Sequence, residues 1–395
     1  MHKFYIFLII ANISLPSLSQ ELYNEYHKKS REEKTTANPS YPDLFFEYRI
    51  AELNKNTPVE LEYNEAVRYY IDLYTIHRRE EFARIIGLSE LYFPFFDEML
   101  AKFGLPLELK YLTIVESGLN PLAVSKSGAV GLWQFLLNTG RLFDLEINSY
   151  IDERRDPFIS TEAACRYLKY LYGTFNDWQL VLSSYNGGPG DVRKAIERSD
   201  GAVNYWEIRP HLSEQAQNYV PAFIAVAYLM KYYHDHHITP VPPQYKYHDL
   251  DTLRISYYLT FSQISGMLDI PVEEIRFLNP VYKLDVIPEM SEPAVLILPK
   301  DKISLFIQNE SRILGRDPEE EDYHTMINNA KSTDNKIQII HVVERGEFFH
   351  KIAMKYNCTL ENIKTWNKLS DNTLSPGQKL IIWVDKDLHD KRTER

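Results

Sequence analysis

The chain has 395 residues and a formal net charge of −11, from 44 Lys and Arg against 55 Asp and Glu. Its 44% of hydrophobic and 25% of charged residues are typical of a folded globular protein and exclude a largely disordered one. The acidic balance argues against nucleic acid as a partner, because phosphates need a basic surface. A chain of this length is expected to form about two to four domains.

The N-terminus has the pattern of a secretory signal peptide. A basic start at Lys3 precedes a short apolar run over 4–15, and small residues follow up to Ser19. We expect residues 1–19 to be removed near Ser19/Gln20, so that the mature protein works outside the cytoplasm. An uncleaved anchor is the alternative, although the run is shorter than the roughly 20 residues that span a bilayer. Peripheral membrane association stays open.

Apolar residues at helical spacing, such as Val67, Tyr70, Ile71 and Tyr74, predict helices from about residue 60 to 233. We divide this part into a lead-in over 20–85, loosely ordered before about residue 58, and a helical domain over 86–235. A break at 234–243, rich in proline, ends the domain.

The C-terminal third contains an internal repeat. Residues 264–279 and 352–367 match at a constant offset of 88 positions, and strand-like runs precede and follow both copies. Each copy therefore predicts a strand–helix–helix–strand module. The boundaries that follow are a first module at 249–300, a linker at 301–335, a second module at 336–385 and a tail at 386–395.

Metal and disulfide sites are not expected. Cys165 and Cys358 are the only cysteines and lie far apart, so free thiols are favoured over a single interdomain disulfide. His234, His236 and His237 predict a solvated helix end, with a metal site as the alternative. We predict no cofactor and no metal.

One carboxylate lies at a position that disfavours its ionised form. A helix starting near Pro106 is apolar nearly all round and ends at Gly118, with Glu116 in its last turn. The helix dipole and the apolar neighbours both disfavour the ionised form, so the pKa of Glu116 should be raised, as a general acid requires. The alternative is a Glu116 that reaches solvent or pairs with a basic side chain (Lys110, Lys126 or Arg141).

Short motifs follow in a fixed order. Residues 116–121 read Glu-Ser-Gly-Leu-Asn-Pro, residues 125–135 read Ser-Lys-Ser-Gly-Ala-Val-Gly-Leu-Trp-Gln-Phe, residues 183–190 read Ser-Ser-Tyr-Asn-Gly-Gly-Pro-Gly, and residues 219–221 read Tyr-Val-Pro. With the Asp-Glu-Arg-Arg-Asp-Pro run at 152–157, they resemble the lysozyme-like lytic transglycosylases. The likeness is greatest to the membrane-bound lytic murein transglycosylase D family, over about 104–230.

The resemblance implies a lysozyme-like fold and cleavage of the β-1,4 bond between N-acetylmuramic acid and N-acetylglucosamine in peptidoglycan. The product would be a 1,6-anhydro sugar, with Glu116 as general acid and then base. Substrate contacts would come from Ser125, Ser127, Gln134, Tyr185, Asn186 and Tyr219.

Two departures from the family pattern stand near these motifs. Gln215 and Ala216 replace its Glu-Thr before Tyr219, and Leu119 stands where it often has an aromatic residue. Residues 186–190 could be only a turn. The run 152–156 is expected to be a salt-bridged loop before a helix capped by Ser160, although it offers spare carboxylates for a two-carboxylate mechanism.

The repeat resembles the lysin motif (LysM), a βααβ module that binds glycan containing N-acetylglucosamine. The second copy is the better match, and the resemblance implies glycan contacts at Gly346, Glu347, Asn367, Pro376 and Gly377. Phe348 replaces the usual Thr or Ser of the motif. The first copy is degenerate, so it is either a weak binder or a structural element.

The sequence thus predicts a mainly α, multidomain α+β protein: a lysozyme-like catalytic domain followed by small LysM modules. It predicts an exported peptidoglycan lytic transglycosylase whose partners are glycan strands. A lysozyme-type hydrolase on the same fold is the first alternative, and a non-catalytic wall-binding scaffold is the second.

Overall fold

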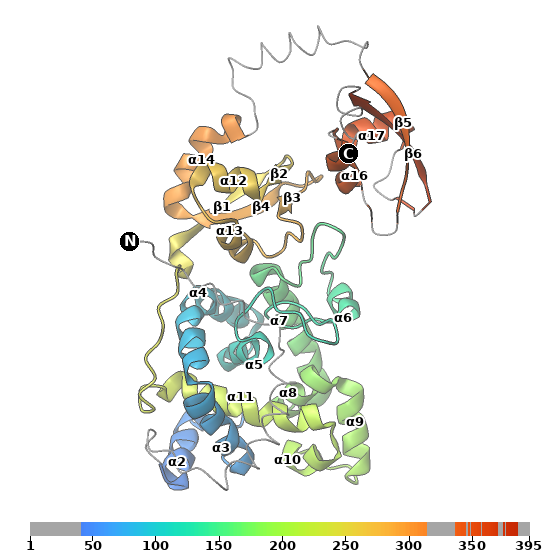
Figure 1. Cartoon of the computed structure of the whole chain (residues 1–395). Coiled ribbons are helices and arrows are strands. Elements are labelled where there is room, and N and C mark those ends of the chain that lie inside the picture. Colours follow the sequence, from blue (N-terminus) through green and yellow to red (C-terminus); the bar gives the residue numbers. More distant parts are fainter. Residues whose placement is uncertain are drawn as a thin grey trace. The chain divides into compact units, whose positions relative to one another are not determined.

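The computed structural model describes residues 41–313, 336–344, 347, 349–356, 358–369, 374, 375 and 377–385. The chain forms two compact units that divide after Ile313 (Figure 1). The predicted signal peptide, most of the predicted linker and the tail lie outside the described residues. Within the described ranges, no helix has both the length and the apolar character needed to cross a bilayer.

The first unit begins with a helical domain, which confirms the mainly α prediction. Its helices are α2 (Asp43–Asn54), α3 (Glu65–Asp72), α4 (Arg79–Phe103), α5 (Leu112–Ser117), α6 (Leu137–Leu142), α7 (Pro157–Phe175), α8 (Trp178–Gly187), α9 (Pro189–Arg198), α10 (Tyr205–Ile208) and α11 (Glu214–Tyr232). Short π or 3-10 turns are η1 (Leu73–His77), η2 (Leu107–Tyr111), η3 (Arg209–His211) and η4 (Tyr247–Asp249).

Helix α11 is the central element of this domain. It packs against α3, α5 and α8, and nearly every residue from Tyr219 to Leu229 is buried (Figure 1). The same hydrophobic core includes Phe46 and Ile50 of α2. Part of the segment predicted to be loosely ordered is therefore a packed helix, because these two side chains are needed to cover the core.

Helix ends follow the sequence signals closely. Asn64 caps α3 by accepting hydrogen bonds from the amides of Ala66 and Val67, both at 3.1 Å. Helix α4 ends at Gly104, which has the left-handed conformation (φ +68°) that glycine adopts without strain. The helix predicted from Pro106 differs in its first part: the chain forms the 3-10 turn η2 before α5 begins at Leu112.

The first module follows η4 in the same unit. Strand β1 (Leu250–Ile255) pairs antiparallel with β4 (Ala294–Pro299), so that Leu250 lies opposite Pro299. Between them come β2 (Leu259–Thr260), α12 (Phe261–Leu268), α13 (Val272–Leu278) and β3 (Val286–Ile287), with β2 paired to β3.

This module extends beyond the predicted boundary at residue 300. Residues assigned to the linker form helix α14 (Lys300–Ile313), which packs against α12, β1 and β4. Phe306 of α14 is buried in the module core. The sequence alone does not reveal this helix as part of the module, because the surface that buries its apolar side chains is formed only in the folded module.

The second unit contains the second module. Strand β5 (Lys336–Val342) pairs antiparallel with β6 (Lys379–Asp385), and α16 (Phe349–Tyr356) and α17 (Leu360–Asn367) lie between them in sequence. The offset of 88 relates α12 to α16 at both ends, so the predicted repeat is a structural repeat as well.

One asparagine has the same role in both copies. Asn279 follows α13, donates to the carbonyls of Ile275 and Ile297 at 3.0 and 2.8 Å, and accepts from the Ile297 amide at 2.7 Å. Asn367 donates to the carbonyls of Ile363 and Ile381 and accepts from the Ile381 amide at 2.6 Å. Both amide hydrogens of Asn367 are thus used to fasten the second helix to the last strand.

We therefore expect Asn367→Ala to act on the stability of the second module. Loss of these bonds should cost about 1–3 kcal/mol, because the strand amide and both carbonyls lose their partner. Hydrogen exchange of the β6 amides in the full chain measures this, and exposed Thr365 on the same helix supplies the control Thr365→Ala. Weaker glycan binding with unchanged β6 protection would instead make Asn367 a direct sugar contact.

Candidate active site

The site is organised around the carboxyl group of Glu116. Helix α5 is short, and its residues Leu112, Ile114 and Val115 are buried in the domain core. Gly118 ends the helix in the left-handed conformation at φ +59°. Glu116 itself is only 7% exposed, so the alternative of a solvated side chain does not hold.

Burial sets the protonation of this group. Removal from water raises the pKa of Glu116 to about 7, and a hydrogen bond from Tyr219 partly opposes the rise. The Tyr219 hydroxyl donates to Oε1 of Glu116 at 2.5 Å, across 103 positions of sequence. Because no carboxylate contributes to this shift in the part of the chain that the structure describes, Glu116 is a solitary acid. It is poised to titrate near neutral pH.

Tyr219 forms this bond although Gln215 and Ala216 replace the residues that the family has before it. Its pKa is raised well above the ordinary value by burial and by the charge of Glu116, so Tyr219 is a hydrogen-bond donor at neutral pH. Helix α11 supplies it from the centre of the domain, which fixes the direction of the hydroxyl toward α5.

Tyr185 lies close to Glu116 but bonds elsewhere. Its pKa is raised well above the ordinary value, first by burial and then by the charge of Glu116. Its hydroxyl donates to the backbone oxygen of Trp133 at 2.8 Å, and the indole N–H of Trp133 donates to Thr161 at 2.8 Å. Tyr185 therefore ties α8 to the segment that carries Gln134.

That segment, the 125–135 loop, is folded back on itself. Isolated bridges join Val130 to Val124 and to Phe135. Gly131 adopts φ +86°, and a Cβ there would lie 1.8 Å from the backbone oxygen of Arg154. Only glycine fits such a contact. Gln134 is also left-handed (φ 50°) and donates its amide to the Gly131 carbonyl at 2.8 Å.

The other predicted substrate contacts lie at or near the surface of the site. Ser125 is half-buried and Ser127 is exposed, and their hydroxyls are 3.0 Å apart. Asn186 is half-buried at the end of α8, and its buried Oδ1 has no hydrogen-bond partner in the described structure. That oxygen is available to a ligand donor.

Sequence reasoning missed Ser117 as a contributor. Its hydroxyl bonds the Leu132 carbonyl at 3.0 Å and the Thr113 carbonyl at 2.8 Å. It therefore joins the residue after Glu116 to the 125–135 loop. The sequence shows Ser117 only as part of the Glu-Ser motif, because nothing in it identifies the partner of the hydroxyl group.

The acidic run at 152–156 serves the structure of the site. Asp152 forms a two-pronged ion pair with Arg154, at 2.9 and 2.7 Å, and both side chains are buried. Asp156, not Ser160, caps α7, accepting from the amides of Phe158 and Ile159. Pro157 occupies the first helical position, so Ser160 already lies inside the helix.

Among His234, His236 and His237, which were predicted to form a solvated helix end, His236 is an exception. His236 is buried, its Nε2 lies 2.9 Å from the Tyr228 hydroxyl, and burial lowers its pKa to about 4. Within the described ranges, no three His, Cys, Asp or Glu side chains are grouped so that they could hold a metal ion. Cys165 and Cys358 are not joined in a disulfide.

In the second module, the predicted glycan contacts fall into two groups. Gly346 and Pro376 lie outside the described residues, and Gly377 is an exposed turn residue with φ +86°. Glu347 has a side chain only 3% exposed, which accepts from His341 at 2.7 Å and from the Glu344 amide at 2.8 Å. The Glu344 amide and His341 lower the pKa of Glu347, so it is a buried carboxylate that holds the turn.

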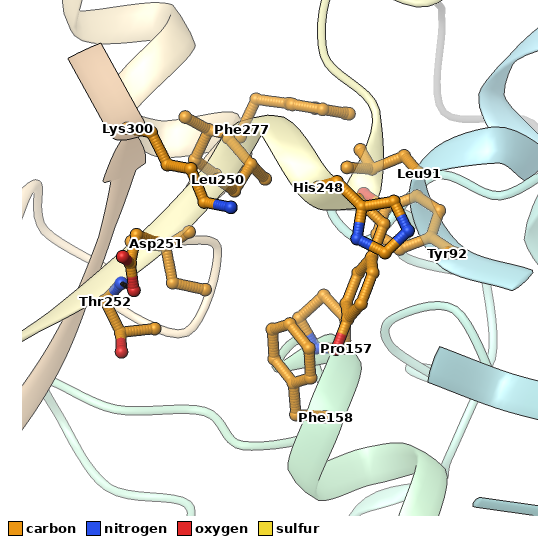
Figure 2. A pocket seen from close by; sticks show the side chains of 13 residues that line it. Leu91, Tyr92, Pro157, Phe158, His248, Leu250, Asp251, Thr252, Phe277 and Lys300 are labelled. Atoms are coloured by element: carbon orange, nitrogen blue, oxygen red, sulfur yellow. Dashed lines mark hydrogen bonds between the residues drawn. The ribbon is translucent and has the colours of Figure 1, made fainter. Parts of the chain in front are cut away.

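A pocket of about 260 Å³ lies between the helical domain and the first module (Figure 2). Leu91 and Tyr92 of α4 and Phe158 of α7 form one side, and Asp251 of β1 and Lys300 of α14 lie on the other. Glu116 is not among its lining residues, so this pocket is separate from the candidate active site.

Three parts of the chain match known domain families. Residues 94–208 match the family described as "Transglycosylase SLT domain", residues 249–314 match "Lytic transglycosylase MltD, LysM-like domain", and residues 341–383 match "LysM domain". The chain therefore combines a transglycosylase SLT domain with a LysM-like and a LysM domain, which confirms the resemblance found in the sequence.

Individual relatives give the extent of the likeness. The chain is 27% identical over 298 residues to "Membrane-bound lytic murein transglycosylase D" of Escherichia coli, covering 74% of this chain and 64% of the relative. It thus spans slightly less than two thirds of that protein. A "Putative tributyltin chloride resistance protein" of Alteromonas is 32% identical over 117 residues, 29% of this chain and 56% of its own.

Among solved structures, the 70 kDa soluble lytic transglycosylase of Escherichia coli is 24% identical, with a TM-score of 0.32, over 38% of this chain and 25% of that one. The lytic transglycosylase Slt of Pseudomonas aeruginosa, solved as an inactive mutant, is 22% identical, with a TM-score of 0.30, over 37% of this chain and 24% of that one.

Proposed function

We propose that this protein is a peptidoglycan lytic transglycosylase that cleaves the β-1,4 bond between N-acetylmuramic acid and N-acetylglucosamine. The observation that carries the proposal is Glu116: a single buried carboxyl with a pKa of about 7, held by Tyr219. The matches to a transglycosylase SLT domain and to two LysM-type domains support the choice of substrate.

The first step needs an acid. With a pKa of about 7, Glu116 is about half protonated at neutral pH and mostly protonated below it, so it can donate its proton to the glycosidic oxygen as the bond to the anomeric carbon breaks. The acetamido oxygen of the muramic acid residue assists at that carbon. The free Oδ1 of Asn186 could accept a hydrogen bond from the acetamido N–H.

The second step uses the same residue as a base. Glu116, now a carboxylate stabilised by the Tyr219 hydroxyl, takes the proton of the 6-hydroxyl, whose oxygen attacks the anomeric carbon. The ring closes to the 1,6-anhydro sugar, and Glu116 regains its proton. The substrate supplies the nucleophile, so one carboxyl is enough.

The carboxylates of the acidic run 152–156 are engaged in structural contacts, which favours this chemistry over hydrolysis. Glycoside hydrolases of the ordinary type flank the bond with two carboxylates. In the described part of this site, Asp152 is paired with Arg154, Asp156 caps α7, and Glu153 accepts from the Glu146 amide. Each carboxylate of the acidic run therefore already has a structural partner.

We assign glycan binding to the second LysM module. Such a module would raise the local concentration of the enzyme on the cell wall, with a gain of about 10²–10⁴ in avidity when both parts bind at once. Because peptidoglycan is the substrate, we place the protein in the periplasm or cell envelope after export.

Glu116→Gln should abolish cleavage of purified sacculi while leaving folding and wall binding near normal. General acid–base groups contribute about 10²–10⁴ in rate, and here one residue plays both parts. Mass spectrometry of the released muropeptides measures activity and product together. Glu98→Gln, an exposed glutamate on α4, is the matched control and should retain full activity.

The products decide between the readings of this fold. Fragments one water lighter than hydrolysis products, without a reducing end, are expected. Reducing-end products would make the protein a lysozyme-type hydrolase. A Glu116→Gln variant with more than a tenth of the wild-type rate would remove Glu116 from its role. A folded protein that binds sacculi and releases nothing would support the scaffold reading.

Tyr219→Phe should shift the alkaline limb of the pH–rate profile to higher pH. The Tyr219 bond lowers the pKa of Glu116, so its loss raises that pKa and keeps the acid protonated to higher pH. The maximal rate should fall about tenfold, because the carboxyl loses its orientation. Tyr228→Phe, on the same helix but bonded to His236, is the control and should leave the limb in place. A limb that stays or moves to lower pH would contradict the assignment.

Deletion of residues 336–395 should weaken binding to sacculi by about tenfold or more, and leave cleavage of short soluble glycans within about twofold. Sedimentation with sacculi measures the first, and muropeptide release from soluble strands measures the second. Equal losses on both substrates would show that the second unit does not act as a tether.

A further inference from the structure

The first module touches the helical domain through a segment that leads directly into the active site. Residues 148–152 and 281–283 form what we call the brace contact. Ile151 and Tyr282 make an antiparallel bridge, the Asp152 amide donates to the Val281 carbonyl at 2.9 Å, and the Lys283 amide donates to the Tyr150 carbonyl at 2.8 Å. The Lys283 ammonium group adds a bond to the Asn148 carbonyl at 2.8 Å.

Ile151 completes the core of the module. It is 5% exposed, and it belongs to the hydrophobic cluster that contains Ile255, Phe261 and Tyr282 rather than to the core of its own domain. Tyr282 is fixed in turn, because its hydroxyl donates to the Val295 carbonyl of β4 at 2.6 Å. Ile151 of the helical domain is thus part of the module's hydrophobic core.

The next residues connect this contact to the 125–135 loop. Asp152 is 3% exposed and holds Arg154 by two hydrogen bonds. Arg154 donates to the carbonyls of Gly128 and Phe135, both at 3.2 Å. Its own carbonyl lies against Gly131. Arg154 therefore contacts the loop at three positions: Gly128, Gly131 and its last residue, Phe135.

The loop in turn supports the residues around the acid. Its Leu132 carbonyl accepts from Ser117, the neighbour of Glu116, and its Trp133 carbonyl accepts from Tyr185. An unbroken series of contacts therefore runs from the first module through Ile151, Asp152 and Arg154 to the candidate catalytic residue.

Two pockets lie near the brace contact, whereas Leu250 and Phe277 of the module pack against the core of the helical domain. The pocket of Figure 2 and a second one of about 400 Å³ share Pro157, Phe158 and Thr252. The second pocket is lined by Ile151, Val281 and Tyr282 themselves. The brace contact is thus bordered by a pocket, and the contacts of Leu250 and Phe277 can keep the module in place when the brace contact is altered.

We propose that the first LysM-like module is a brace for the active-site loop, with Asp152 and Arg154 as positioning residues, rather than a freely tethered glycan binder. The inference rests on the proposed function for its catalytic consequence, but the brace itself is a property of the fold. Loop misplacement of about 1 Å can cost about a hundredfold in rate, so a support of this kind has a measurable effect.

The test is hydrogen exchange of the full chain after Ile151→Asp, which places a charge in the module core and releases the brace contact. The amides of residues 125–135 should exchange at least tenfold faster, while those of α11 stay protected. On soluble glycan strands, kcat should fall tenfold or more with KM within about twofold. Leu284→Asp, an exposed position on the same segment, is the matched control and should change neither. The milder Ile151→Ala, with the same direction of change, serves if the aspartate prevents folding.

The outcomes separate the brace from the activity. If the amides of residues 281–283 exchange faster in the Ile151 variant but those of residues 125–135 do not, the proposal is overturned, whatever the activity. A faster-exchanging loop in a chain whose wild type cleaves no glycan would support the brace and refute the proposed function. A fall in kcat/KM carried by KM alone, with an unchanged loop, would make the module a substrate-binding element and overturn the brace.

Discussion

The site depends on one unfavourable arrangement. The carboxyl group of Glu116 is buried in the core, and the hydrogen-bond partner that the described residues give it is the hydroxyl of Tyr219. Raising the pKa of Glu116 from 4.5 to about 7 costs roughly 3 kcal/mol of folding free energy once the pH exceeds both values, at about 1.4 kcal/mol per pKa unit. The sign follows from the native state binding the proton more tightly, so stability falls as pH rises between these values. A domain with about 5–15 kcal/mol of stability must compensate for this elsewhere. The long buried helix α11, which also supplies Tyr219, is the part of the core best placed to do so.

The surrounding polar contacts limit where that acid can point. Tyr219 holds one carboxyl oxygen, Ser117 fastens the end of α5 to the 125–135 loop, and Tyr185 fastens α8 to the same loop. Gly131 lets the loop lie directly on the backbone of Arg154, which a side chain would prevent. Arg154 is buried only because Asp152 neutralises it, and a buried pair of this kind is costly to break from one side. The result is a site whose geometry is fixed by interactions between segments far apart in the sequence.

Local signals predicted much of this from the sequence. Gly118 and the apolar residues before it predicted the end of α5 and the buried position of Glu116, and the offset of 88 predicted the two modules. What could not be predicted depends on contacts at long range. The sequence predicts a linker where helix α14 lies, because the surface that buries Phe306 is formed by β1, β4 and α12 only in the folded module. His236 was read as solvated because Tyr228 and Arg79, which enclose it, are visible only in the fold. The shared structural role of Asn367 and Asn279 is likewise seen only in their hydrogen bonds to the last strand of each module.

The central claim is that Glu116 is a buried acid that titrates near neutral pH. The most direct measurement is a pH titration of its side-chain carboxyl by ¹³C NMR on the full chain labelled at glutamate, with the resonance assigned by its loss in Glu116→Gln. The account predicts a midpoint near 7, well above the ordinary glutamate value of 4.5. A midpoint near 4.5 would show that the carboxyl is ionised and solvated at neutral pH, and would contradict its role as the acid.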